Sequence, residues 1–208
     1  MGGTPLAHSP SVLWQAPDDA VYVSRKGRVI NIRIQRREEE SRIDEELAAR
    51  GDAQAQFRLA HNFERGNGLP QNYHRAHDLY TLAARQGHAL AQHNLGRMLE
   101  NGFGALQDYI QAKHWYELAA RQGNSYAQYS LGVMAALGRG GKEDDVTAHM
   151  WFNLASAAGH KAAAQNREFI ASRMTPAQIV SAQEQARKWA EQYQPRQSRI
   201  SRAEQGRH

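Results

Sequence analysis

The chain of 208 residues carries 26 Lys and Arg against 21 Asp and Glu, is 41% hydrophobic and contains no cysteine. This length suits one folded domain, and the lack of cysteine excludes disulfide bridges and thiolate metal sites as supports for the fold. The fold must therefore be held by packing. Much of the apolar fraction is alanine, which suits helices packed closely side by side.

Residues 1–20 are predicted to be a flexible N-terminus. They contain no basic stretch followed by an apolar run of signal-peptide length. The sequence also has no unbroken apolar segment able to span a bilayer. We therefore expect a cytoplasmic protein.

Residues 21–37 predict a β-hairpin. Val21–Val23 and Val29–Ile34 are rich in β-branched residues, and the short segment Arg25-Lys26-Gly27 lies between them. Two strands alone are marginally stable in water, so the hairpin needs a neighbour. It either packs on the rest of the chain or recruits a partner by strand pairing at its open edge.

A capping helix is predicted over residues 38–50, and a repeat with a period of 36 residues follows it. Within each period, apolar residues at helical spacing are interrupted by a Gly-x-Gly break and then resume. Such a fixed period predicts a repeat protein in which each unit is two helices and a turn. The period returns Gly51, Gly87, Gly123 and Gly159, then Leu59, Leu95 and Leu131, and then Tyr80, Tyr116 and Phe152.

Local residues specify the helix ends. In the first repeat, helix A is predicted over about Asp52–Arg65 and helix B over about Tyr73–Gln86. Asn or Asp ahead of each helix B is typical of an N-cap, and glycine after it tolerates the left-handed backbone of a helix end. The predicted caps are Asn72, Asp108 and Asp144.

The fourth unit, residues 159–174, is degenerate, because Arg167 stands where the earlier units have leucine. Thr175-Pro176-Ala177-Gln178 then reads as a capping box with proline at the first helical position. It predicts a helix over 175–194 that covers the last exposed apolar face, as solenoids require. The apolar stripe of that helix consists of Ile179, Ala182, Ala186 and Trp189.

This pattern resembles the Sel-one-like repeat (SLR) family, which is related to tetratricopeptide repeats. The match is close in Gly87–Gln92, Leu95-Gly96, Gly102-Phe103-Gly104, Asp108, Ala112 and Trp115–Gly123. It covers residues 51–166, with repeats at 51–86, 87–122 and 123–158 before the degenerate unit. The closing helix looks like that of bacterial members.

The resemblance implies an all-α fold, a right-handed α-solenoid of antiparallel helix pairs in which helix A of each repeat lines a concave surface. Members of the family usually act as scaffolds or adaptors and are not, as a class, enzymes. The chain is therefore expected to bind a partner protein or peptide through the concave face of its helices A.

Helical spacing indicates which side chains of helix A are left free on that face. Arginine pairs with carboxylates and exposed tyrosine buries area at low entropy cost, so the expected partner carries acidic or aromatic residues. The candidate residues are Phe57, Arg58, His61 and Arg65 in the first repeat, His93, Asn94, Arg97 and Asn101 in the second, and Tyr126, Tyr129 and Val133 in the third.

No catalytic residue, cofactor or metal site is predicted. The segment Gly138–Lys142 superficially resembles a phosphate loop, but that motif requires glycine at Ala136 and a hydroxyl residue at Glu143. Its Gly-x-Gly recurs with the period, so a turn explains it. His74 and His77 share a helix face, yet no third metal ligand stands near them in the sequence.

The excess positive charge lies near the C-terminus. Residues 187–208 hold 6 Lys or Arg against 2 Asp or Glu, whereas residues 51–186 hold 12 against 11. Residues 195–208 are therefore predicted to be a basic, disordered tail. The alternative is that this arginine-rich tail binds nucleic acid or another anionic surface.

Overall fold

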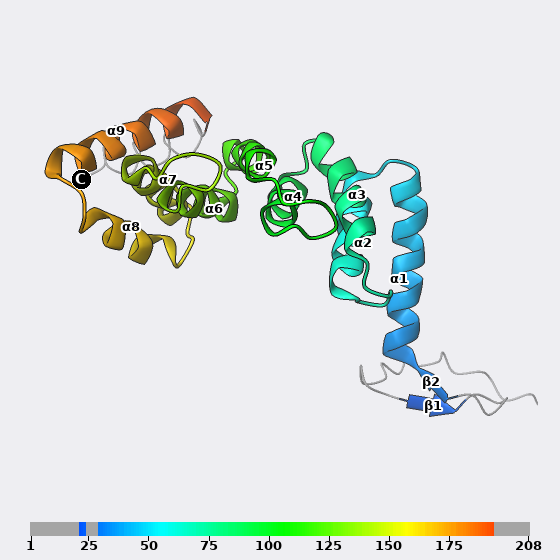
Figure 1. The fold of residues 1–208 in the computed structure, drawn as a ribbon. Helices are drawn as coiled ribbons and strands as arrows, with labels where there is room; N and C mark the ends of the chain where they lie inside the picture. The colour runs from blue at the N-terminus through cyan, green and yellow to red at the C-terminus, as the bar shows by residue number, and fades with distance from the viewer. Residues whose placement is uncertain (1–20, 24–28, 194–208) are drawn as a thin grey trace, which may run out of the picture.

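The computed structural model describes residues 21–23 and 29–193, with side chains from Glu40 to Tyr193. The predictions for residues 1–20 and 195–208 lie outside these described residues. The helices lie side by side in one elongated stack (Figure 1). None of the helices in the described ranges is both long enough and apolar enough to cross a membrane.

A short hairpin precedes the helices. Strand β1 (Val21–Val23) pairs antiparallel with β2 (Val29–Asn31), and Tyr22 lies opposite Ile30. Figure 1 shows this pair beyond the end of α1 that lies away from the other helices.

Helix α1 (Ile32–Ala49) begins earlier than predicted. The sequence favoured a second strand as far as Ile34 and a helix only from residue 38, and both boundaries are wrong. The segment from Gln35 to Glu40 consists of Gln, Arg and Glu, all strong helix formers. Because a helix extends easily once it has nucleated, this polar segment allows α1 to extend towards the N-terminus as far as Ile32.

Three helix pairs follow α1, as the period predicts, and the fold is an all-α solenoid. Helix A of each repeat is α2 (Ala53–Arg65), α4 (Ala89–Asn101) or α6 (Ser125–Ala136). Helix B is α3 (Tyr73–Arg85), α5 (Tyr109–Arg121) or α7 (Asp145–Ala157). The degenerate unit contributes the shorter α8 (Ala163–Ala171), and α9 (Pro176–Tyr193) closes the stack.

The predicted caps of helix B are present. Asn72, Asp108 and Asp144 each accept a hydrogen bond from the backbone N–H three residues on, at 3.0, 2.9 and 3.0 Å. Sequence reasoning missed that helix A is capped in the same way, by Asp52, His88 and Asn124. His88 does so with its ring Nδ1, which accepts from the Ala91 N–H at 3.1 Å.

The core runs continuously through the repeats. Leu59, Leu95 and Leu131 are at most 4% exposed, so the periodic leucines face inward as predicted. At the C-terminal end Ala182 and Ala186 are buried, and the Trp189 ring lies 4.6 Å from that of Trp151 in α7. Helix α9 therefore covers the last repeat.

The predicted capping box starts α9. The Thr175 N–H donates to Gln178 Oε1 at 2.8 Å, and the Gln178 N–H donates to Thr175 Oγ1 at 3.3 Å. These reciprocal bonds satisfy two backbone donors at the start of the helix.

Buried glutamines link successive helices through a hydrogen-bonded ladder. Gln56 and Gln92 donate from Nε2 to the carbonyls of Ala48 and Ala84, at 3.2 and 3.1 Å. Their Oε1 atoms accept from Nε2 of Gln86 and Gln122, at 2.8 and 2.7 Å. Each inner glutamine is thus satisfied on both sides of its amide.

The ladder is incomplete in the third repeat. Gln128 donates to the Ala120 carbonyl at 3.4 Å, but Ala158 occupies the position of Gln86 and Gln122. The buried Oε1 of Gln128 consequently has no hydrogen-bond partner within the described part of the chain. Such a group carries a desolvation cost that the two earlier repeats avoid.

The Gly-x-Gly loops bring successive repeats into close contact. Gly104 has a φ of +72°, and a Cβ placed on it would lie 2.2 Å from the Tyr73 carbonyl oxygen at the start of α3. Gly87 has a similar φ of +88°, but nothing lies within 4 Å of its Cβ position. An alanine at Gly87 would therefore meet backbone strain alone, whereas an alanine at Gly104 would meet the same strain and a steric overlap.

We predict that G104A destabilises the protein more than G87A. The left-handed conformation alone costs an L-residue about 1–2 kcal/mol, and G104A adds the overlap with the Tyr73 carbonyl. Urea unfolding followed by circular dichroism measures both losses. Equal losses in the two variants would show that the loop moves away from α3 freely.

We also predict that A158Q stabilises the protein by about 1 kcal/mol, because it supplies the missing donor to Gln128 Oε1. Ala158 has φ and ψ of −85° and 9°, close to the −82° and 3° of Gln86, so the new side chain starts from matching backbone. Thermal unfolding should show a rise of about 2–4 °C. The neighbouring exposed residue gives the control A157Q, which should leave the transition unchanged.

Candidate functional site

A hollow of about 480 Å³ opens between α2 and α4, the helices A of the first two repeats. We call it the charged hollow, because arginine, glutamate and histidine side chains dominate its lining. Helical spacing brings each of them to the same side of its helix. The lining residues are Phe57, His61, Glu64 and Arg65 from α2, Leu90, His93, Asn94 and Arg97 from α4, and Tyr126 from α6.

Glu64 is the centre of a polar network in this hollow. Its carboxylate accepts a hydrogen bond from the Tyr80 hydroxyl at 2.9 Å and forms an ion pair with Arg97. Asn94 Nδ2 donates to the same hydroxyl oxygen at 3.0 Å. Burial, followed by the charge of Glu64, raises the pKa of Tyr80 above its usual range, so this hydroxyl remains a donor.

Arg65 differs from Arg97 in having no such partner. It is the last residue of α2 and is exposed, and no hydrogen bond or ion pair within residues 40–193 holds its guanidinium. Two arginines against the single Glu64 leave the lining with one net positive charge. The hollow is therefore suited to an anionic group such as a carboxylate.

The two histidines of the hollow add no charge at neutral pH. Burial lowers the pKa of His93 to about 4, and the nearby Arg97 adds to this effect. Burial, with a further contribution from Arg65, also lowers the pKa of His61. Both rings are neutral and offer flat polar surface beside the arginines.

Seven of the eleven residues that we placed at the partner-binding face line this one hollow, namely Phe57, His61, Arg65, His93, Asn94, Arg97 and Tyr126. The other four lie elsewhere, and Val133 lines a separate hollow next to α8. Arg58 donates from Nε to Asp44 Oδ1 of α1 at 2.9 Å, and Asn101 donates from Nδ2 to the Arg97 carbonyl at 2.7 Å. The Tyr129 ring stacks on His160, with centroids 4.2 Å apart.

Sequence reasoning missed Glu64 and Leu90. The sequence did contain a signal for Glu64, because glutamate recurs one period later as Glu100. In the structure, Glu100 accepts a hydrogen bond from the Tyr116 hydroxyl at 2.8 Å. In the third repeat Ala136 and Phe152 replace the glutamate and the tyrosine together. This joint replacement indicates that the two side chains interact.

The histidines and the glycine loop considered from the sequence make local contacts. His74 Nδ1 lies 2.9 Å from the Gly104 carbonyl oxygen, and His77 Nδ1 lies 3.4 Å from Asp78 Oδ1. Gly138 and Gly140 have φ angles of +64° and +75°, as the predicted turn requires. No group of three or more potential metal ligands comes together in the described ranges.

We predict that His93 makes stability depend on pH. Its pKa in the folded state, about 4, lies below the ordinary value of 6.5, so the unfolded state binds the proton first as pH falls. The His93 contribution is complete above about pH 6.5 and is lost as pH falls towards about 4, by up to about 3 kcal/mol. Urea unfolding at about pH 7.5 and about pH 5 should show a smaller difference for H93Q than for wild type.

The control for this prediction is H114Q, which changes an exposed histidine on α5. Its pH dependence should match that of wild type. A wild-type pH dependence in H93Q would mean that the His93 ring protonates in the folded state without cost.

The Sel1 repeat family model matches the chain three times, over residues 53–88, 89–124 and 125–160. Each match begins at the first residue of a helix A. Sel1 repeat proteins form a non-catalytic family whose members generally act as scaffolds for protein–protein interaction. No curated protein matches the chain.

Two solved structures are similar to it. A Sel1 repeat protein from Oxalobacter formigenes shares 26% identity with a TM-score of 0.63, over 73% of this chain and 62% of that one. A protective antigen of uropathogenic Escherichia coli with an SLR fold shares 28% identity with a TM-score of 0.50, over 74% of this chain and 41% of that one. The chain thus spans less than two thirds of either neighbour. With its three matched repeats and its stacked helix pairs, it belongs to the Sel1 repeat family.

Proposed function

We propose that the protein is a scaffold that binds an acidic segment of a partner protein at the charged hollow. The observation that carries the proposal is the cationic excess in a hollow on the helix A side. Seven of the residues selected from the repeat pattern line it, and the Arg65 guanidinium has no partner in the described part of the chain. The non-catalytic character of the family supports a binding role.

The two arginines suit this task in different ways. Arg97 is held by Glu64, so its guanidinium is already ordered and loses little further entropy when a ligand binds. Arg65 is exposed, so a carboxylate reaches it without displacing an internal partner. Electrostatic attraction of this kind raises the association rate and fixes the orientation of the bound segment.

Tyr126 contributes area rather than charge. Its ring is 60% exposed and lies 5.9 Å from the ring of His93 at the edge of the hollow. A tyrosine in this position covers apolar parts of a ligand with one face and offers its hydroxyl to polar groups. It extends the binding surface from α4 towards α6.

We predict that R65E weakens binding of an acidic peptide at least about tenfold, because it places like charges together. The probe is a random peptide library displayed on phage and selected on the full-length protein, followed by calorimetry with a synthetic peptide of the enriched sequence. The enriched sequences should contain Asp or Glu. The affinity should also fall as salt is added.

The matched control is R85E. Arg85 is the last residue of α3, as Arg65 is of α2, and it is exposed, so both variants reverse a charge at the same position of a helix. R85E should bind like wild type. Selection of sequences without acidic residues, or equal binding by R65E and wild type, would contradict the proposal.

A further inference from the structure

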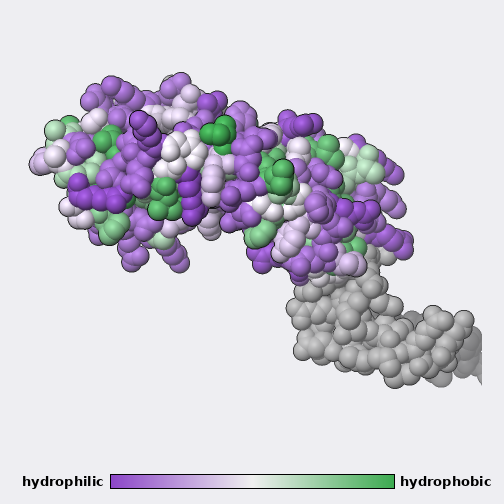
Figure 2. Space-filling model, viewed as in Figure 1, coloured by the Kyte–Doolittle hydropathy of each residue, from purple (hydrophilic) through white to green (hydrophobic). Residues whose placement is uncertain are grey.

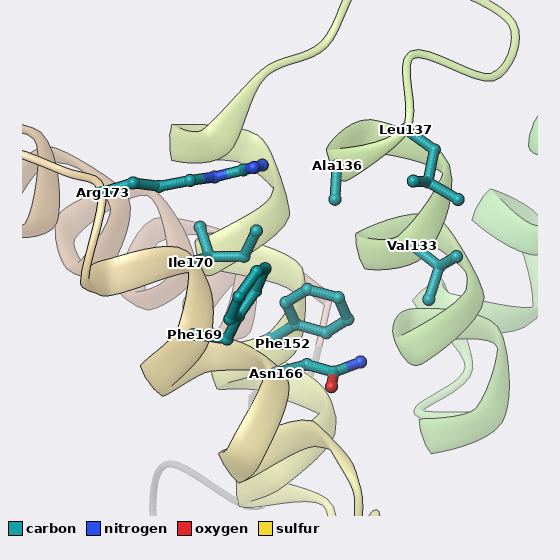
Figure 3. A pocket seen from close by; sticks show the side chains of 8 residues that line it. All are labelled: Val133, Ala136, Leu137, Phe152, Asn166, Phe169, Ile170 and Arg173. Carbon is teal, nitrogen blue, oxygen red and sulfur yellow. The ribbon is translucent and has the colours of Figure 1, made fainter.

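A second hollow, of about 240 Å³, lies between α6 and α8 with α7 beneath it. Figure 3 shows Val133 of α6 and Leu137, the residue after α6, facing the rings of Phe152 and Phe169 across it. We call it the apolar hollow, since only Asn166 and Arg173 bring polar groups to its lining. In Figure 2 apolar residues on the visible face form separate patches among hydrophilic ones, so this protein does not present one broad apolar surface there.

The apolar hollow is the repeat equivalent of the charged hollow, two periods later. Asn166 corresponds to Asn94 and is kept, whereas five other positions change from polar or charged to apolar. The replacements are Val133 for His61, Ala136 for Glu64, Leu137 for Arg65, Phe152 for Tyr80 and Phe169 for Arg97.

These replacements change the chemistry of the lining. In the charged hollow, Glu64, Tyr80 and Arg97 satisfy one another through a hydrogen bond and an ion pair. Ala136 has no carboxylate and Phe152 has no hydroxyl, so the corresponding lining is apolar. Phe169 is 67% exposed at its edge. A concave apolar site with few polar groups is the usual form of a binding pocket.

Aromatic rings connect the two hollows without a gap. Tyr126, which lines the charged hollow, lies 5.2 Å from the ring of His160. His160 stacks on Tyr129 at 4.2 Å, and the Tyr129 hydroxyl accepts from Nδ2 of Asn166 at 2.9 Å. We call Tyr126, His160 and Tyr129 the aromatic bridge. The bridge forms a continuous surface between the two hollows, along which one extended ligand contacts both.

We propose that the acidic partner segment also carries one large apolar side chain, Leu, Met or Phe, which it inserts into the apolar hollow. This inference rests on the proposed function and adds the second recognition element. A cavity of about 150 Å³ already accepts a benzene ring, so about 240 Å³ is enough for one such side chain. The partner is thus defined by an acidic part towards α2 and an apolar anchor towards α8.

Charge argues against occupation by the chain's own C-terminus. Residues 195–208 contain four arginines and one glutamate, so they carry the same sign as the charged hollow at the other end of the bridge. An acidic segment from another protein is complementary to that charge. The tail and a second copy of the chain are therefore alternatives for experiment to exclude.

The test removes the apolar hollow by giving it the side chains of its charged equivalent, in the triple variant A136E/F152Y/F169R. The introduced groups reproduce the mutually satisfied set of Glu64, Tyr80 and Arg97, so the fold has a precedent two repeats earlier. If the triple variant unfolds at a lower temperature than the wild type, the single variant L137R provides a second test. Leu137 is 53% exposed, and the equivalent position holds Arg65.

The probe is the selected acidic peptide, compared with the same peptide in which its one large apolar residue is alanine. With wild-type protein this alanine should weaken binding about tenfold or more, as expected for loss of one buried apolar side chain. With the triple variant or L137R, the alanine substitution in the peptide should change the affinity by less than about twofold. With R65E the alanine substitution in the peptide should still weaken binding, because the apolar hollow is unchanged.

The outcomes separate this inference from the proposed function. If the alanine substitution in the peptide still weakens its binding to the triple variant and to L137R, while R65E still weakens binding of the acidic peptide, the apolar anchor is wrong and the acidic site stands. If no acidic peptide is selected, both are wrong. A change of molar mass by light scattering in the hollow variants would indicate a second copy as occupant, and tighter peptide binding after deletion of residues 195–208 would indicate the tail; either overturns the inference.

Discussion

The solenoid depends on a packing contact that recurs in the second and third repeats, where an aromatic ring of helix B lies on a glycine of helix A. A Cβ on Gly96 would lie 2.8 Å from the Tyr116 ring, and one on Gly132 would lie 2.6 Å from the Phe152 ring. Only glycine admits the ring at this distance, so the helices of a pair approach closely. In the third repeat the same contact fixes the position of the Phe152 ring, which lines the apolar hollow.

The chemistry around the helix B ring follows from a single hydroxyl group. Where the ring is tyrosine, its buried hydroxyl requires an acceptor, and Glu64 or Glu100 supplies one. Each glutamate in turn is paired with an arginine, although Arg97 and Arg139 come from different positions of the repeat. Loss of the glutamate alone would leave a buried donor without a partner. Phenylalanine and alanine therefore appear together in the third repeat.

Periodicity predicted the helix pairs, the caps of helix B and the closing helix, because these depend on residues close together in the sequence. It did not predict the start of α1, where alternating isoleucines indicated a strand and the following polar residues favoured a helix. It placed Arg58 on the binding face, although helical spacing alone does not reveal that Asp44 of α1 lies beside it. The apolar hollow was not predicted, although Val133 was placed on the free face of helix A, because only the neighbouring helices show that a space remains between Val133, Phe152 and Phe169.

Repeat architecture allows recognition to change without a change of fold. Each repeat contacts mainly its neighbours, so the side chains at the centre of one hollow vary while the leucines, caps and glycines around them stay the same. In this chain the hollow at α2 and α4 carries charge and the one at α6 and α8 does not. A ligand that spans the two proposed sites, which are two repeats apart, would be selected by the distance between its groups as well as by their chemistry. Such discrimination follows from the linkage of two weak contacts within one segment, since the second contact forms at the effective concentration that the first one creates.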